Sequence, residues 1–318
     1  MLTLPFEEAN QKLLEGEFEN SKSLFASLLD NDPENIHYIA GYFISSYWDN
    51  RLDRIFSVKE GKDRGILLDE LFEKFENDFS EKKYPKTESF YSVRNCILGE
   101  SCSQLRLGYQ KEGAALDQKI IWTLCRNLVI IRDYKNAIDM IDYCKRKYDM
   151  PSEFYYYKAE SLFHVGEEKK SRTLFRSTLL HFPESLPIEQ IKSEPIASAI
   201  LELKTKIEKE SDLKEYLPVF CMEKDLLPEV PEYTREDVNH FLYEMNRLRE
   251  SLETDNKDMY FKVKSRILQY GFTIMDTFQG QINSELTRKV RDIISEIDPG
   301  CLERRDSNRR MKSRVEEE

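Results

Sequence analysis

The chain has 318 residues and a formal net charge of −11, with 40% hydrophobic and 34% charged residues but only 11 glycines and 11 prolines. This composition excludes a low-complexity disordered chain and a turn-rich β protein, and it favours an ordered, all-α fold. No apolar run approaches the ~20 residues that a membrane-spanning helix needs, and the N-terminus lacks the basic and apolar segments of a secretory signal. We therefore expect a cytoplasmic protein that does not enter a membrane and whose acidic body repels nucleic acid.

Two segments repeat one pattern at an offset of 150 residues: GEFENSKSLFASLLDNDPEN, residues 16–35, and GEEKKSRTLFRSTLLHFPES, residues 166–185. The identical positions are Gly16/Gly166, Glu17/Glu167, Ser21/Ser171, Leu24/Leu174, Phe25/Phe175, Ser27/Ser177, Leu29/Leu179, Pro33/Pro183 and Glu34/Glu184. This agreement indicates that the chain contains more than one copy of the same structural unit.

A second comparison gives the length of the unit. Ala137 lies 34 residues before Ser171, and Cys125 lies 34 residues before Ala159, so small side chains coincide. The pattern resembles the tetratricopeptide repeat (TPR), a helix-turn-helix of ~34 residues with small residues where the helices cross, an aromatic residue in the second helix and a closing proline. In the clearest copy the resemblance assigns these roles to Ala159, Gly166, Ser171, Phe175 and Pro183.

The resemblance implies a right-handed superhelical array of helical hairpins over residues 1–185. Antiparallel helices approach closely only where a small side chain lies at the crossing, and each hairpin must stack on neighbours to cover its apolar face. The match is clear over residues 6–35 and 118–185, weak over 36–117 and absent beyond about 190. Arg132 occupies the usual glycine position of one copy, and serine replaces the usual alanine at Ser21 and Ser171.

The array is expected to be interrupted, because an offset of 150 residues is not a multiple of 34. We place an irregular insertion around residues 50–117, where Gly61 and Gly65 predict a loop between two long helices. Residues 86–113 fit either one long helix or two short helices broken near Gly99, and the sequence does not choose between them.

Residues 186–303 are predicted to form a C-terminal helical region that contains a proline-rich linker at 217–234. Apolar residues at helical spacing predict helices near 196–207, 238–252, 260–267 and 286–297, and Thr234 with Asp237 has the pattern of an N-terminal cap. Residues 304–318 carry six basic and four acidic side chains, so the body before them carries −13. We expect this charged tail to be disordered.

Signatures of catalysis and metal binding are missing. In GESCS, residues 99–103, Ser103 replaces the final glycine of a nucleophile elbow, and in EGKDRG, residues 60–65, Asp63 stands where a phosphate-binding loop needs Ser or Thr. The four histidines have no second His or Cys one helical turn away. We therefore expect no enzyme activity, metal or cofactor. His164 is predicted to be a packed or surface polar residue, with ligand contact as the alternative.

The TPR resemblance implies that the fifth and ninth residues of each first helix line a concave, peptide-binding groove. The predicted groove residues are the aromatic Phe6, Trp122 and Tyr156 at the fifth position and the polar Asn10, Arg126 and Glu160 at the ninth. The alternative is that the rings pack between adjacent hairpins. One TPR subclass grips a C-terminal carboxylate with Lys at the fifth position and Asn at the ninth. Because Phe6 replaces that Lys, an apolar or amphipathic peptide is the favoured ligand.

We predict a non-enzymatic scaffold that binds a protein or peptide segment in this groove. One alternative is an enzyme with an unrecognised site in the C-terminal helical region. The other is nucleic-acid binding through the basic tail, in which no aromatic residue offers a platform for base stacking. The acidic body opposes the approach of a polyanion, so nucleic acid is the less favoured partner.

Overall fold

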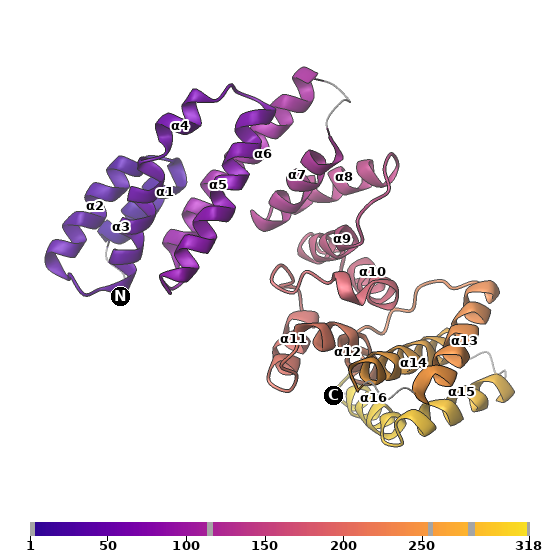
Figure 1. The fold of residues 1–318 in the computed structure, drawn as a ribbon. Helices are drawn as coiled ribbons and strands as arrows, with labels where there is room; N and C mark the ends of the chain where they lie inside the picture. Colours follow the sequence, from indigo (N-terminus) through magenta and orange to yellow (C-terminus); the bar gives the residue numbers. More distant parts are fainter. Residues whose placement is uncertain (1–3, 113–116, 254–256, 279–283, 317–318) are drawn as a thin grey trace. The chain divides into compact units, whose positions relative to one another are not determined.

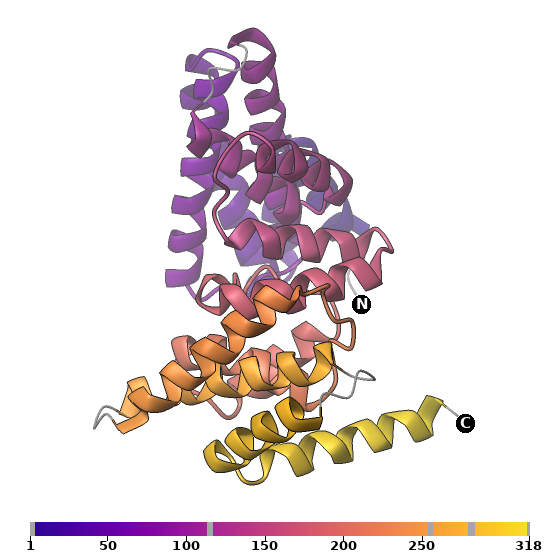
Figure 2. The ribbon, with the colours of Figure 1, turned by 90° about the vertical axis from the view of Figure 1, so that its right-hand side faces the viewer.

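The computed structural model describes residues 4–112, 117–253, 257–278 and 284–316 (Figures 1 and 2). Every regular element in these residues is a helix, which confirms the all-α prediction. Within the same ranges, no helix combines the length and the apolar character needed to cross a membrane. The chain divides into two compact units, called unit 1 (Met1–Tyr148) and unit 2 (Asp149–Glu318).

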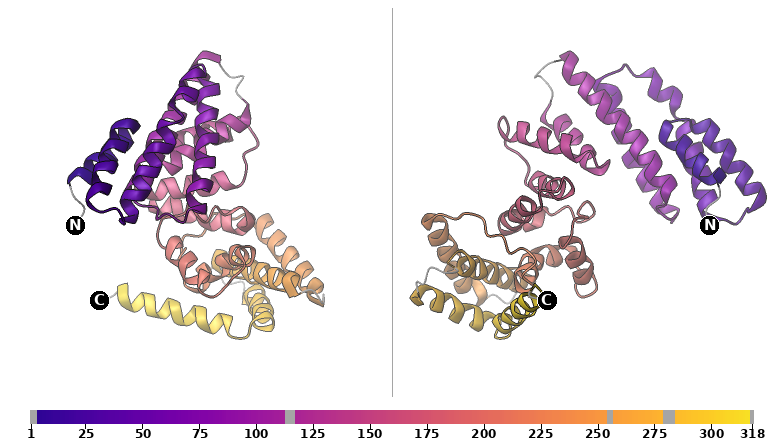
Figure 3. Two further views of the ribbon diagram at one scale, coloured as in Figure 1. Left: turned by 60° about the vertical axis from the view of Figure 1, so that its left-hand side comes forward. Right: turned by 180° about the vertical axis from the view of Figure 1, so that it is seen from behind.

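Unit 1 consists of three helices beside a pair of long ones, followed by a hairpin (Figure 3). The first three are α1 (Leu4–Glu15), α2 (Phe18–Asn31) and α3 (Ile36–Asp49), and the short α4 (Leu52–Ser57) follows. The long pair is α5 (Lys62–Glu81) and α6 (Glu88–Glu112), and the hairpin is α7 (Gln118–Ile130) and α8 (Tyr134–Lys145). Helix α6 contacts α1 and α3 as well as α5 and α7, so it joins the parts of the unit.

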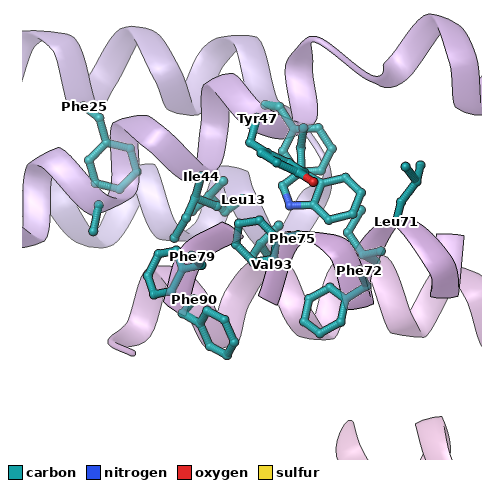
Figure 4. Packing of buried hydrophobic residues seen from close by; sticks show 14 of the residues in the cluster. Leu13, Phe25, Ile44, Tyr47, Leu71, Phe72, Phe75, Phe79, Phe90 and Val93 are labelled. Atoms are coloured by element: carbon teal, nitrogen blue, oxygen red, sulfur yellow. The ribbon is translucent and has the colours of Figure 1, made fainter. Parts of the chain in front are cut away.

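An aromatic cluster holds α3 against α5 and α6. Trp48 of α3 is fully buried, with its ring centroid 5.6 Å from that of Phe75 and 6.4 Å from that of Phe72, both on α5. Phe90 of α6 packs on Phe79 with the centroids 5.1 Å apart, and Figure 4 shows the phenylalanines of α5 and α6 gathered beside α3. Such aromatic pairs contribute about 0.5–1.5 kcal/mol each beyond the area they bury.

Glycines allow α5 and α6 to approach closely. A Cβ atom on Gly65 would lie 2.7 Å from the Leu105 side chain, and a Cβ atom on Gly108 would lie 2.7 Å from the backbone nitrogen of Lys62. Any larger residue at these positions would push the two helices apart, since close-packed interiors leave no space to absorb it.

The insertion predicted around residues 50–117 is more regular than expected. Gly61 precedes α5, but Gly65 lies inside the helix, so the prediction of a loop through Gly65 is wrong. Its lack of a side chain serves the crossing with α6 instead of a turn. Helix α6 runs unbroken through Gly99, which decides between the two alternatives in favour of one long helix.

Unit 2 starts with the hairpin of α9 (Glu153–His164) and α10 (Glu168–His181). Its remaining elements are η2 (Pro183–Ser185), α11 (Ile196–Lys204), α12 (Glu210–Glu223), α13 (Arg235–Glu250), η3 (Ser251–Glu253), α14 (Lys257–Thr277), α15 (Ser284–Ile297) and α16 (Cys301–Glu316). Tyr156 of α9 and Phe175 of α10 share one buried cluster with Leu203 of α11 and Leu217 of α12. The division of the chain therefore differs from the predicted boundary after residue 185, because this hairpin buries its apolar face against the C-terminal helices.

The linker predicted at 217–234 is shorter than expected, because α12 continues to Glu223 with Pro218 inside it. The proline removes one interior hydrogen bond and costs about 3 kcal/mol. Burial of Leu217, Val219 and Phe220 offsets this cost, at about 1.5–3 kcal/mol for each large apolar side chain. The predicted cap of α13 is confirmed: the Thr234 side chain accepts from the Asp237 N–H at 3.2 Å, and the Thr234 N–H donates to the Asp237 carboxylate at 2.8 Å.

The prediction of a disordered tail at 304–318 is wrong, because α16 extends to Glu316. Its arginines are paired with carboxylates that lie far away in the sequence. Arg304 donates to Glu223, and Arg309 donates to Asp225 and Asp276. These ion pairs explain why a segment with the composition of a disordered tail is ordered.

The α1–α2, α7–α8 and α9–α10 hairpins share the same turn. Gly16, Arg132 and Gly166 have positive φ angles of 79°, 67° and 86°. In each turn, the N–H of the following residue donates to the carbonyl five residues earlier, at 2.9, 2.8 and 2.9 Å. This arrangement closes the end of the first helix and starts the second. The arginine in the middle hairpin keeps the same turn as the glycines.

The helix crossing is also the same in the first and last of these hairpins. The Ser21 hydroxyl donates to the Ala9 carbonyl at 2.9 Å, and the Ser171 hydroxyl donates to the Ala159 carbonyl at 2.7 Å. All four residues are buried. Serine fits at this crossing because its hydroxyl is paired with the facing backbone, and the offset of 150 residues marks equivalent positions in both hairpins.

Gly166→Ala is expected to lower the free energy of unfolding by about 1 kcal/mol, because a non-glycine residue costs about 1–2 kcal/mol in the left-handed region. The matched control is Gly99→Ala, since an added Cβ meets no atom within 4 Å at either site. Gly99 lies inside α6, so alanine there should stabilise the protein by about 0.5–1 kcal/mol. Urea denaturation measures both changes, and a stabilising Gly166→Ala would contradict the role of the turn.

Candidate binding site

Two of the predicted groove residues, Phe6 and Tyr156, lie inside their own units. Phe6 is 1% exposed and packs on Phe25 with the ring centroids 5.9 Å apart. Tyr156 is fully buried and donates its hydroxyl to the Phe182 carbonyl at 2.9 Å, and burial raises the pKa of this phenol well above its usual value. The structure therefore corrects the groove assignment of both rings, which pack against neighbouring helices because the hairpin crossing leaves space beside it for an aromatic side chain.

Asn10 and Glu160 at the ninth position are also buried, at 2% and 1% exposure, and each attaches a neighbouring segment. Asn10 accepts a hydrogen bond from the Ser89 hydroxyl of α6 at 2.6 Å. Glu160 accepts from the backbone N–H groups of Lys192 and Ser193, at 2.9 and 3.1 Å, and from the Ser193 hydroxyl at 2.7 Å. Their groove assignment is corrected too, since both side chains are buried and bonded to other segments of the chain, although Asn10 Nδ2 has no hydrogen-bond partner among the described residues.

Trp122 and Arg126 of α7 remain partly exposed. The Arg126 guanidinium donates to Asp69 at 2.7 Å and to Glu73 at 3.1 Å, both on α5. The Trp122 ring meets Tyr148 edge-on with the centroids 6.2 Å apart. Of the six predicted residues, these two keep surface that a partner can reach, and they do not form one site with the other four.

His164, Glu160 and Ser193 lie together, but not in the order that nucleophilic catalysis requires. In a catalytic triad the histidine lies between the nucleophile and the acid. Here Glu160 lies between the other two, with one carboxylate oxygen 2.9 Å from His164 Nε2 and the other accepting from Ser193. Ser193 is also buried, so this cluster fixes the segment before α11 and does not activate a nucleophile.

An apolar cavity of about 210 Å³ lies between α6, α7 and α8 of unit 1. Its walls are formed by Leu105, Arg106, Tyr109 and Gln110 of α6, Ile120, Ile121 and Leu124 of α7, and Met140 and Tyr143 of α8. The α7 residues follow helical spacing, so one face of that helix supplies the apolar wall.

Polar groups lie at the cavity on α6 and α8. The hydroxyls of Tyr109 and Tyr143 are hydrogen-bonded at 2.7 Å, and Lys147 donates to the Tyr143 hydroxyl at 2.6 Å. The hydrogen bonds from Lys147 and Tyr109 lower the pKa of Tyr143. Nη2 of the Arg106 guanidinium lies 3.4 Å from a carboxylate oxygen of Asp133. The cavity therefore combines an apolar interior with phenol hydroxyls and cationic groups.

Three cysteines lie near the cavity. Cys102, Cys125 and Cys144 lie on the same three helices, and all are buried. Burial raises the pKa of Cys102 to about 12, and a hydrogen bond with Cys144 together with burial raises the pKa of Cys125. Protonated thiols are poor nucleophiles, which applies to Cys102 and Cys125, whereas the hydrogen bond with Cys125 lowers the pKa of Cys144. In the part of the chain that the structure describes, no group of three His, Cys, Asp or Glu residues is placed to hold a metal ion.

No single motif in the sequence indicates this cavity. Tyr109 and Tyr143 lie 34 residues apart, the same spacing as Cys125 and Ala159. Residues 36–117 match the repeat pattern only weakly, so this spacing did not identify the pair.

Comparisons with protein-family models, with curated proteins and with solved structures found no match.

Glu160→Ala is expected to destabilise unit 2 by about 2 kcal/mol or more, because each buried donor left without a partner costs about 1–3 kcal/mol. The control is Glu189→Ala, which removes an exposed carboxylate paired with Lys204 and should change stability by less than about 0.5 kcal/mol. Chemical denaturation compares the two variants. Equal stability of the two variants would contradict the structural role assigned to Glu160 and would restore its assignment to an exposed groove.

Proposed function

We propose that this protein is a non-enzymatic binding protein whose hairpins form a TPR-like, right-handed superhelical array. Its partner is a protein segment that inserts one large apolar side chain into the cavity between α6, α7 and α8. The observation that carries this proposal is the cavity itself, whose apolar walls include a phenol pair, with Lys147 outside the lining and hydrogen-bonded to the Tyr143 hydroxyl.

The size of the cavity favours a single side chain over a metabolite. Pockets for drug-sized ligands have volumes of about 300–1,000 Å³. An apolar cavity of about 150 Å³ accepts one benzene molecule. A cavity of about 210 Å³ lies nearer the second value, so it suits the side chain of Phe, Leu or Trp. A peptide that presents such an anchor gains most of its affinity from that one contact.

The charge around the cavity favours an acidic residue next to the anchor. Helix α8 ends in Lys145, and Arg146 and Lys147 follow it. Lys147 contacts the cavity-lining Tyr143, and Arg106 of α6 supplies a second cation. These groups stand out against a chain with net charge −11, and an acidic flank on the peptide would complement them. Trp122 and Arg126 lie on the other face of α7 and are not among the residues that line the cavity.

Met140→Trp is expected to abolish binding, because the larger side chain fills the cavity from the α8 wall. A random peptide library displayed on phage and selected on the full chain should enrich sequences with one large apolar residue followed by Asp or Glu. Replacing that residue by alanine in a synthetic peptide should weaken binding about 30-fold, which corresponds to a hot spot of about 2 kcal/mol.

Asp139→Trp is the matched control, since residue 139 is exposed on the same helix and outside the cavity wall. This variant should bind the selected peptides as the unchanged protein does. Equal binding by Met140→Trp and Asp139→Trp would refute the cavity as the anchor site. Turnover of a substrate that the Met140→Trp change abolishes would replace the binding function with an enzymatic one.

A further inference from the structure

Asp276 of α14 joins three helices of unit 2 through buried charges. Its carboxylate accepts hydrogen bonds from Arg176 of α10 and from Arg305 of α16. The side chains of these three residues are each no more than 2% exposed. Arg309 of α16, which is partly exposed, donates to the same carboxylate at 2.9 Å. One buried carboxylate is therefore shared by guanidinium groups from two other helices.

The buried part of this cluster carries more positive than negative charge. Arg176 and Arg305 contribute two positive charges, whereas Asp276 contributes one negative charge. Removing a charge from water is costly, so buried charges in proteins are normally balanced by partners of opposite sign. The three side chains leave an excess of one positive charge in the interior of unit 2.

The ion pairs around the cluster do not compensate this excess. Arg309 is also paired with Asp225, and Arg304 is paired with Glu223. Each of these pairs adds one positive and one negative charge. The balance of the buried cluster therefore stays positive among the described residues.

Both buried arginines also keep an unused hydrogen-bond donor. The Nε atoms of Arg176 and Arg305 are buried and have no hydrogen-bond partner among the described residues. In the planar guanidinium group, Nε shares an edge with Nη2, the atom through which each arginine reaches Asp276. The Phe272 ring lies over the face of the Arg305 guanidinium, with Cζ 4.5 Å from the ring centroid, so it leaves the donor in the plane unpaired.

The pKa of Arg305 agrees with an incompletely balanced charge. Burial lowers this pKa, and the attraction of Asp276 raises it, but repulsion by Arg309 and Arg176 adds to the effect of burial. The net result is a pKa below the usual value of an arginine. An anion beside the guanidinium would act in the opposite direction, because a negative charge favours the protonated form.

A small anion satisfies both the unused donors and the excess charge. A buried donor without a protein partner is explained by strain, by an ordered water or by an ion. A water molecule could accept from the Nε–H groups, but it would leave the positive charge uncompensated. Since both arginines are almost fully buried, a monatomic anion suits the site better than a larger phosphate-bearing molecule.

Asp276 itself would repel such an anion, but the arginines outweigh it. Its two carboxylate oxygens already accept from Nη2 of Arg176, Arg305 and Arg309. An anion at the Nε atoms therefore meets more positive than negative charge, at atoms whose hydrogen bonds are unused.

We propose that unit 2 binds one halide ion, chloride in ordinary salt solutions, against the Nε edges of Arg176 and Arg305. The ion accepts hydrogen bonds from α10 and α16 and holds both helices beside α14. Because it binds the folded state alone, it stabilises unit 2. This inference does not rest on the function proposed for the cavity in unit 1.

Hydrogen exchange of the full chain tests for the ion in solution. Sodium chloride replaces sodium gluconate at constant ionic strength, so the screening of surface charges does not change. The amides of α14 should exchange about tenfold more slowly for each tenfold rise in chloride once the site is mostly occupied. The amides of α3 in unit 1 should keep their rates. Unchanged rates in α14, or equal slowing in α3 and α14, would overturn the proposal.

Arg305→Gln and Arg310→Gln form a matched pair, because each removes one positive charge from α16. Arg305 is buried beside Asp276, whereas Arg310 is exposed. Arg305→Gln should abolish the chloride dependence of exchange in α14, and Arg310→Gln should leave it as it is in the unchanged chain. The same chloride dependence in both variants would contradict a site at the buried arginines.

A crystal of the unchanged protein grown in sodium bromide locates the ion directly, whether or not Arg305→Gln folds. Anomalous scattering should show a bromide ion within hydrogen-bonding distance of the Nε atoms of Arg176 and Arg305. A water molecule at these atoms, with no anomalous signal, would refute the anion site.

Discussion

The close crossing of two antiparallel helices is the constraint on which the rest of this structure depends. In the α9–α10 hairpin, the Ser171 hydroxyl bonds the Ala159 carbonyl at 2.7 Å, so the two backbones leave no room for a larger side chain at that point. Phe175 fills the space beside the crossing, and its ring faces Tyr156 with the centroids 6.3 Å apart. The same contact in the α1–α2 hairpin buries its aromatic residue in the same way.

This constraint determines which residues remain for binding. Once the aromatic residue of the first helix is buried, the polar residue one turn later lies in the interior and must find a partner there. Asn10 finds Ser89, and Glu160 finds Ser193 and two backbone N–H groups. The packing is incomplete between α6 and the α7–α8 hairpin, and the cavity there is the anchor site that we propose. An unfilled apolar cavity costs stability, so a side chain that enters it recovers packing energy.

The features predicted from the sequence were those set by short-range patterns. The cap at Thr234 and the helical content follow from residues close together in the chain. The buried state of Phe6 and Tyr156 did not, because a repeat pattern identifies the face of a helix but not what covers that face. The cavity lay in the part of the chain where the pattern is weakest.

Helix α16 was missed for a related reason. Its composition is that of a disordered segment, and the carboxylates that order it, Glu223 and Asp276, lie 81 and 29 residues from their arginine partners. Pro218 led to the opposite error, because a linker was predicted where the structure has the end of a helix. The cost of a proline inside α12 is outweighed by burial of its neighbours against distant helices. Long-range pairing and burial therefore decide both cases, and neither is visible in local sequence.

The most direct test of the account is a methyl NMR titration of the full chain with indole, a probe of the size of one aromatic side chain. The central claim is that the cavity between α6, α7 and α8 takes such a group. The account predicts saturable shifts for the methyl groups of Ile120, Ile121, Leu124 and Met140, with the methyl groups of α1–α3 unchanged. Unchanged resonances at the four lining residues, or shifts spread evenly over both units, would contradict it.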